Sequence, residues 1–131
     1  MYQNNQQSIP VIDVFAGPGG LGEGFASFTD KHGKHPYRIA ISIEKDPIAH
    51  QTLKLRSFFR QYPQRDVPED YYRHLQGKLT LDELWKQHPS AAESAENETW
   101  RAKLGDDKEA PLDQLRKKTT KHWVIMTTGY W

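Results

Sequence analysis

The chain has 131 residues, of which 36% are hydrophobic, 27% charged and 11% aromatic, and its formal net charge is +1. This length favours one compact domain, and no apolar run approaches the roughly 20 residues that a membrane-spanning helix needs. The Gln- and Asn-rich residues 1–8 lack the charged-then-apolar order of a secretory signal, so we expect a cytoplasmic protein without a membrane partner. The absence of cysteine excludes disulfides, thiolate metal sites and every mechanism with a cysteine nucleophile.

Charge is spread unevenly along the chain. Residues 1–63 carry seven Lys and Arg against five Asp and Glu, residues 64–115 carry seven against twelve, and residues 116–131 carry four against none. A protein that binds DNA through many phosphates usually presents a basic stripe, because counterion release requires Lys and Arg. We therefore expect weak or no DNA binding by this chain alone. His32 and His35 are too close together for a convincing metal site, and none is expected.

The first part of the chain alternates strand and helix signals. The β-branched run Ile9–Phe15 predicts a buried strand that stops at the glycine turn 17–20. Leu21–Phe28 predicts a helix, because its apolar residues recur four and three positions apart. Tyr37–Ile43 alternates as a second strand that ends at Glu44.

A second helix is expected after Glu44. Asp46 suits the N-cap and Pro47 the first helical position, and the helix should continue to about Tyr62. Its core-facing residues, spaced four and three apart, would be Ile48, Thr52, Leu55, Phe59 and Tyr62. The order strand, helix, strand, helix indicates an α/β fold with a parallel sheet and helical crossovers.

Residues 64–118 show no strand signal and predict a helical insertion. Thr80 with Glu83, and Ser90 with Glu93, form two capping-box patterns. The prolines and glycines that would begin or end the helices are Pro68, Pro89, Gly105 and Pro111. The expected packing residues are Leu75, Leu79, Leu84, Trp85, Trp100 and Leu104.

After the insertion, Trp123–Met126 predicts a third strand, which in this fold class lies beside the first. The chain therefore divides into a cofactor-binding βαβα unit at 1–63, a helical insertion at 64–120 and the start of a further core strand at 121–131. An uncovered outer edge on that strand would favour self-association, so we expect a homo-oligomer.

The turn after the first strand has the pattern of a nucleoside-cofactor loop. Gly17, Gly19 and Gly22 match G-x-G-x-x-G, in which glycines allow a sharp turn and close approach of a ligand to the backbone. Glu44 follows the second strand, 22 residues after Gly22, where its carboxylate can accept hydrogen bonds from ribose hydroxyls. Asp13, inside the first strand, is expected to orient the loop backbone.

The residues around these glycines resemble a known family. Val11–Phe25 (Val-Ile-Asp-Val-Phe-Ala-Gly-Pro-Gly-Gly-Leu-Gly-Glu-Gly-Phe) resembles the first motif of the DNA (cytosine-5) methyltransferases, and Ile41–Asp46 (Ile-Ser-Ile-Glu-Lys-Asp) their second. Residues 67–75, 77–84 and 100–105 resemble a helical insertion of one branch of that family. The resemblance implies an incomplete Rossmann-like fold of the S-adenosylmethionine-dependent methyltransferases.

By this resemblance the cofactor is S-adenosylmethionine, whose methyl group the family transfers to C5 of cytosine in DNA. Phe15 would lie against the adenine, the backbone of 17–21 would surround the methionine end, and Glu44 would bind both ribose hydroxyls. The cofactor-binding residues so implied are Phe15, Ala16, Gly17, Gly19, Gly20, Leu21, Glu44 and Lys45. The acidic contact to the adenine amino group stays open between Asp106 and Asp107.

The sequence departs from the family after Met126. Family members place a Pro-Cys catalytic loop after the corresponding strand, whereas this chain reads Thr127–Trp131 and has no cysteine. Attack on C6 of cytosine needs a thiolate, so no residue is assigned a catalytic role and the chain alone is expected to be inactive. It resembles the N-terminal part of such an enzyme, as an early-terminated product, a cloned piece or one half completed by a complementing methyltransferase chain.

Two other functions are compatible with the glycine pattern and the acidic strand end. A small NAD-binding Rossmann protein has the same glycines and the same acidic strand end, although Phe15 and Pro18 suit the methyltransferase pattern better. A non-enzymatic cofactor-binding or interaction domain is the other alternative.

Overall fold

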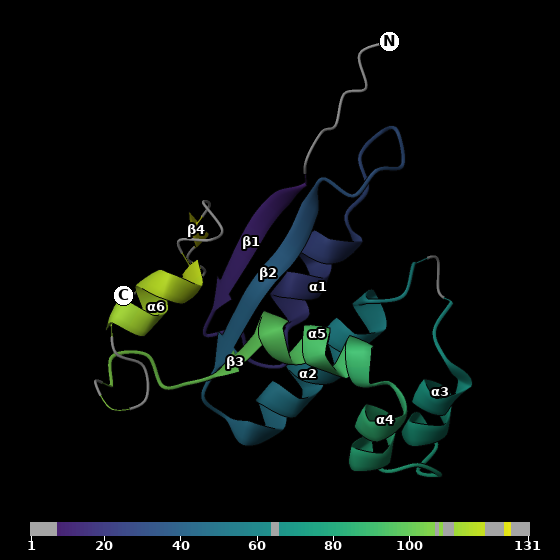
Figure 1. Ribbon diagram of the computed structural model, residues 1–131. Helices are drawn as coiled ribbons and strands as arrows, with labels where there is room; N and C mark the ends of the chain where they lie inside the picture. The colour runs from purple at the N-terminus through teal and green to yellow at the C-terminus, as the bar shows by residue number, and fades with distance from the viewer. Residues whose placement is uncertain (1–7, 64–65, 107, 109–111, 120–124, 127–131) are drawn as a thin grey trace.

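The structure is a computed structural model that describes residues 8–63, 66–106, 108, 112–119 and 125–126. Four parallel strands form one sheet in the order β3-β2-β1-β4 (Figure 1). The strands are β1 (Ile9–Val14), β2 (Tyr37–Glu44), β3 (Thr99–Arg101) and β4 (Ile125–Met126). The expected α/β class, with a parallel sheet of partial Rossmann type, is confirmed.

Helices connect the strands, as parallel pairing requires. They are α1 (Gly20–Ser27), α2 (Pro47–Arg60), α3 (Glu69–Leu75), α4 (Leu81–Gln87), α5 (Pro89–Glu98) and α6 (Leu112–Thr119). Figure 1 shows α1, α2 and α5 gathered on one side of β2, with α6 beside β1 and away from them. No helix in the described part of the chain combines the length and the apolar character needed to cross a membrane.

The prediction that residues 64–118 contain no strand is wrong at β3. The expected helix from Ser90 to Gly105 stops at Glu98, and β3 then pairs in parallel with the edge of β2. The Thr99 side chain is 3% exposed, and its hydroxyl donates to the Ala95 carbonyl at 2.8 Å. Three residues are too few to show a strand period, so the free edge of β2 decides their conformation.

The strand expected near the end of the chain is present as β4, which pairs in parallel with β1 as foreseen. Ile125 and Met126 form it, and the other two residues of the expected strand lie outside the described part of the chain. It is the fourth strand in chain order because β3 precedes it.

Two of the three expected helix caps are confirmed. The Asp46 carboxylate accepts the Ala49 N–H at 2.8 Å at the start of α2, and Thr80 with Glu83 forms the capping box of α4. The Ser90 capping box is wrong, because α5 already begins at Pro89. Proline is pre-set for the first helical position, which places Ser90 inside the helix.

The expected core face of α2 is confirmed only in part, because Leu55 and Tyr62 pack against the core cluster but the most buried residues are others. Its buried residues are Leu53, Ser57 and Phe58, whereas Ile48 is 74% exposed. Phe58 is fully buried. It packs in one cluster with Leu79, Leu84 and Ala95, which belong to the segment that runs from α3 to α5. Because α2 contacts both the sheet and α5, its buried face is shifted from the stripe that the spacing suggested.

Only some of the packing residues expected in residues 64–118 are buried. Leu79 and Leu84 are buried and Trp85 packs against their cluster, but Leu75 is 57% exposed. Trp100 packs instead with the sheet cluster around Ile41 and Ile43, as Leu104 also does. The division of the chain at residues 63 and 120 stays a prediction.

Candidate functional site

The turn between β1 and α1 is a tight loop of residues 15–19 at the carboxyl end of the sheet. Its backbone has positive φ at three positions, Phe15 (57°), Gly17 (56°) and Gly19 (91°). A Cβ on Gly19 would lie 2.7 Å from Cδ2 of Leu53, so both its φ and its neighbour favour glycine there. The Ala16 N–H donates to the Ile43 carbonyl at 3.0 Å, which fastens the loop to β2.

Phe15 is the unusual member of this loop. It is the one described non-glycine residue with a positive φ, and its side chain is 67% exposed. A bulky residue with a Cβ pays a strain energy in the left-handed region, and such residues concentrate at functional sites. The exposed ring therefore stands at the loop as a candidate contact for a flat ligand.

Glu44 joins the loop to the start of α2. Its Oε2 accepts the Gly17 N–H at 2.7 Å, and its Oε1 accepts the Asp46 N–H at 2.9 Å. A carboxylate has about four acceptor positions, so each oxygen retains one for a further donor. The structure thus brings the expected ribose acceptor and the glycine loop into direct contact, although 27 residues separate them in sequence.

All eight residues expected to bind a cofactor lie at this end of the sheet, where parallel α/β folds bind ligands. They are Phe15, Ala16 and Gly17, then Gly19, Gly20 and Leu21 at the start of α1, and Glu44 and Lys45 at the end of β2. Leu21 is 49% exposed, so its side chain is available at the surface.

A cavity of about 620 Å³ lies beside Lys45, between the ends of β2 and β3. Asp46 and Pro47 line it together with three residues that the sequence analysis did not assign to the site, Arg101, Ala102 and Lys103. These three residues lie here because β3 pairs with β2. They would have been included from the sequence only if it had predicted a strand at Thr99–Arg101. Asp106 follows on the same connection, and Asp107 lies outside the described residues.

Asp13 lies below the loop in β1 and is 3% exposed. Asp13 was expected to orient the loop backbone, but among the described residues it accepts no hydrogen bond from the loop, and its Oδ2 has no hydrogen-bond partner there. A Cβ on Gly22 would be 3.1 Å from that oxygen, so the first turn of α1 lies directly on the carboxyl group. Burial raises the pKa of Asp13, and the nearby charge of Arg60 partly opposes the shift.

Neither described histidine of the loop before β2 points to metal chemistry. His32 donates its backbone N–H to Asp30, and the Nδ1 of His35 lies 3.2 Å from the Phe28 carbonyl. Within the described ranges no group of three or more His, Cys, Asp or Glu side chains could hold a metal ion.

Comparison with known proteins relates the chain to the methyltransferases. It is similar to the type II methyltransferase M.Bpa9945I of Bacillus paralicheniformis, with 30% identity over 108 residues. The match covers 77% of this chain and 23% of the relative, so the chain spans about a quarter of the length of that protein. No family model matches the chain, and no solved structure matches it.

Proposed function

We propose that this chain binds S-adenosylmethionine and forms the cofactor-binding part of a DNA cytosine-5 methyltransferase. The observation that carries the proposal is the contact between Glu44 and Gly17, which joins an acidic strand end to a glycine loop at the ligand-binding edge of a parallel sheet. The similarity to a type II methyltransferase supports the same class of cofactor. When bound, the cofactor would supply an activated methyl group.

The donor and acceptor set fits an adenosine ligand. The free acceptor positions of Glu44 suit the two hydroxyls of a ribose, because a diol offers two donors to one carboxylate. Its backbone donors, Gly17 and Asp46, already hold the carboxylate in place before a ligand arrives. Such preorganisation lowers the entropic cost of binding.

The two ends of the ligand would meet different surfaces. The exposed ring of Phe15 offers an apolar face to the adenine. The backbone N–H groups at the start of α1, around Gly20 and Leu21, offer donors to the carboxylate of the methionine end. Asp106, on the connection after β3, is the described candidate for the adenine amino group.

The proposal includes the absence of methyl transfer by these 131 residues alone. Activation of cytosine at C5 needs a covalent adduct with a thiolate, and the sequence has no cysteine. We propose that DNA is contacted in the intact enzyme and weakly or not at all by this chain, and that a complementing methyltransferase chain supplies the missing thiolate. Self-association of this chain is a separate proposal, since a second copy has no cysteine either.

Calorimetric titration tests the cofactor site. S-adenosylmethionine and S-adenosylhomocysteine should bind the wild-type chain, and NAD should not. Glu44→Ala should weaken binding roughly 10- to 100-fold, since hydrogen bonds to a charged group contribute about 1.5–3 kcal/mol. Glu93→Ala removes an exposed carboxylate of α5 and serves as the control that binds as wild type does.

Two outcomes would contradict the proposal. Binding of NAD alone would identify the small NAD-binding protein instead. Failure of every nucleoside to bind would remove the cofactor site and leave an interaction domain related to methyltransferases.

A further inference from the structure

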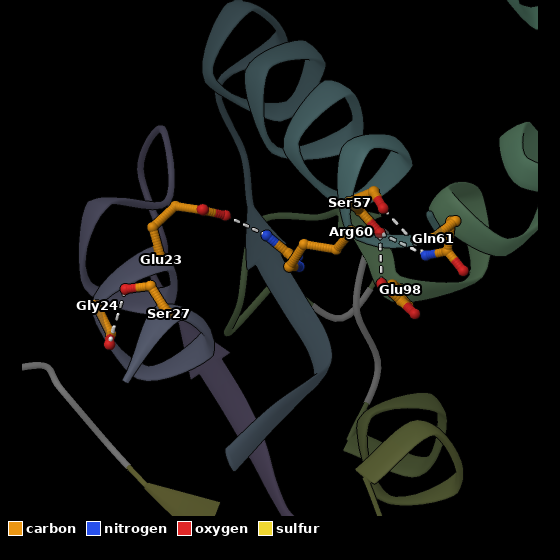
Figure 2. A network of polar contacts seen from close by, with 7 residues as sticks. All are labelled: Glu23, Gly24, Ser27, Ser57, Arg60, Gln61 and Glu98. Carbon is orange, nitrogen blue, oxygen red and sulfur yellow. Dashed lines mark hydrogen bonds and ion pairs between the residues drawn. The ribbon is translucent and has the colours of Figure 1, made fainter. Parts of the chain in front are cut away.

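An ion pair joins the helix that follows the glycine loop to the helix that follows Glu44. The Nη1 of Arg60, in the last turn of α2, contacts Oε1 of Glu23, in the first turn of α1 (Figure 2). The two side chains are 21% and 37% exposed, so solvent screens the pair only in part. Among the residues that the structure describes, α1 makes no other ion pair.

The charge of Arg60 also influences a carboxyl group on the β1 side of the loop. Asp13 precedes the loop in β1, is 3% exposed, and has an Oδ2 without a hydrogen-bond partner in the described part of the chain. The positive charge of Arg60 is close enough to lower the pKa of this carboxyl group against the effect of burial. Glu23, after the loop, forms an ion pair with Arg60, whereas Asp13, before the loop, is affected by the charge of Arg60 without an ion pair between them among the described residues.

The first turn of α1 has a low intrinsic tendency to form a helix, so contacts with other elements must stabilise it. Gly20, Gly22 and Gly24 occupy three of its first five positions, and glycine is among the weakest helix formers. A groove of about 780 Å³ is lined by residues of both helices, including Glu23 and Arg60, so the ion pair links them where space remains between them. The position of α1 therefore depends on tertiary contacts more than on its own sequence.

We propose that Arg60 is a positioning residue, which fixes the start of α1 through Glu23 and so keeps the glycine loop, and Gly17 within it, in reach of Glu44 without touching the ligand. This inference rests on the proposed function, because it concerns the geometry of that same site. Helix α2 begins three residues after Glu44 and ends at Arg60, so this one helix connects the ribose acceptor to the ion pair that positions α1.

A matched control exists on the same helix. Lys54 pairs with Glu96 of α5 at 2.6 Å, and the Lys54 side chain is 19% exposed, similar to Arg60. This second ion pair also joins α2 to another helix, but α5 has no part in the loop. Lys54→Met and Arg60→Met therefore each remove one interhelical ion pair while keeping an unbranched side chain.

The test measures binding of S-adenosylhomocysteine by calorimetry and the amide NMR signals of the loop glycines. Arg60→Met should raise the Kd about fivefold or more, a usual size of coupling between a site and a distant residue. It should also shift the amide signal of Gly17. Arg60→Lys keeps the charge and should bind more tightly than Arg60→Met. The Kd of Lys54→Met should stay within about twofold of that of wild type.

The outcomes separate this inference from the proposed function. If wild type binds and Arg60→Met binds equally well, the positioning role is refuted and the cofactor site stands. If Lys54→Met weakens binding as much as Arg60→Met does, general loss of stability explains both and the inference fails. If wild type does not bind, the proposed function fails, and an unchanged Gly17 amide signal in Arg60→Met would refute the inference as well.

Discussion

The positive φ of Phe15 predicts that glycine should be more stable than alanine at this position. We compare Phe15→Gly with Phe15→Ala, because both lose the ring but only alanine keeps a Cβ at a φ of 57°. The ring is 67% exposed, so its loss removes little burial and does so equally in both variants. Their difference in stability therefore reports the backbone conformation.

The magnitude follows from two opposing effects. The left-handed conformation costs a residue with a Cβ roughly 1–2 kcal/mol, whereas glycine adopts it freely. The greater backbone entropy of unfolded glycine works the other way by about 0.5–1 kcal/mol. We expect Phe15→Gly to be more stable than Phe15→Ala by roughly 0.5–1 kcal/mol, the reverse of the usual order.

Urea denaturation followed by tryptophan fluorescence measures this difference. Ala26→Gly, within α1, is the control, and there glycine should destabilise by about 0.5–1 kcal/mol. Both Phe15 variants should also bind S-adenosylhomocysteine more weakly than wild type, because the apolar face for the adenine is lost. If Phe15→Gly were the less stable of the two, the backbone at Phe15 would not be strained and its functional interpretation would lose its physical basis.

Three further predictions concern the glycine loop, the buried Asp13 and the N-cap of α4. Gly19→Ala should lower the free energy of unfolding by about 1–3 kcal/mol in urea denaturation, because its φ is 91° and the new Cβ would meet Leu53; an unchanged midpoint would contradict the loop geometry. Asp13 has a raised pKa in the folded state, so the native protein holds its proton to higher pH than the unfolded chain, and stability should fall as the pH rises from 3.8 through the folded pKa. Denaturation across this pH range should show that fall in wild type and a weaker one in Asp13→Asn, whereas equal slopes would disprove the shift. Thr80→Ala removes the capping box with Glu83 and should lower the free energy of unfolding by about 1 kcal/mol in urea denaturation. Ligand binding, measured by calorimetry, should not change.

Local chemistry was enough to predict the centre of the candidate site. The β-branched run before the glycines, the alternation from Tyr37 to Ile43 and the Asp46 N-cap are signals carried by neighbouring residues, and the structure has the corresponding elements. Because the carboxyl ends of parallel strands share one edge, the same signals also place Glu44 near the glycine loop.

Tertiary structure decided what no local pattern could. The strand at Thr99–Arg101 forms because the edge of β2 offers backbone partners, and its position brings Arg101 beside Lys45. The buried face of α2 follows from its two neighbours, the sheet and α5, which its own spacing does not reveal. The ion pair between Glu23 and Arg60 joins residues 37 positions apart, and its formation depends on where the sheet places two helices. Sequence periodicity reports only that a residue prefers to be buried, whereas the fold determines which surface buries it.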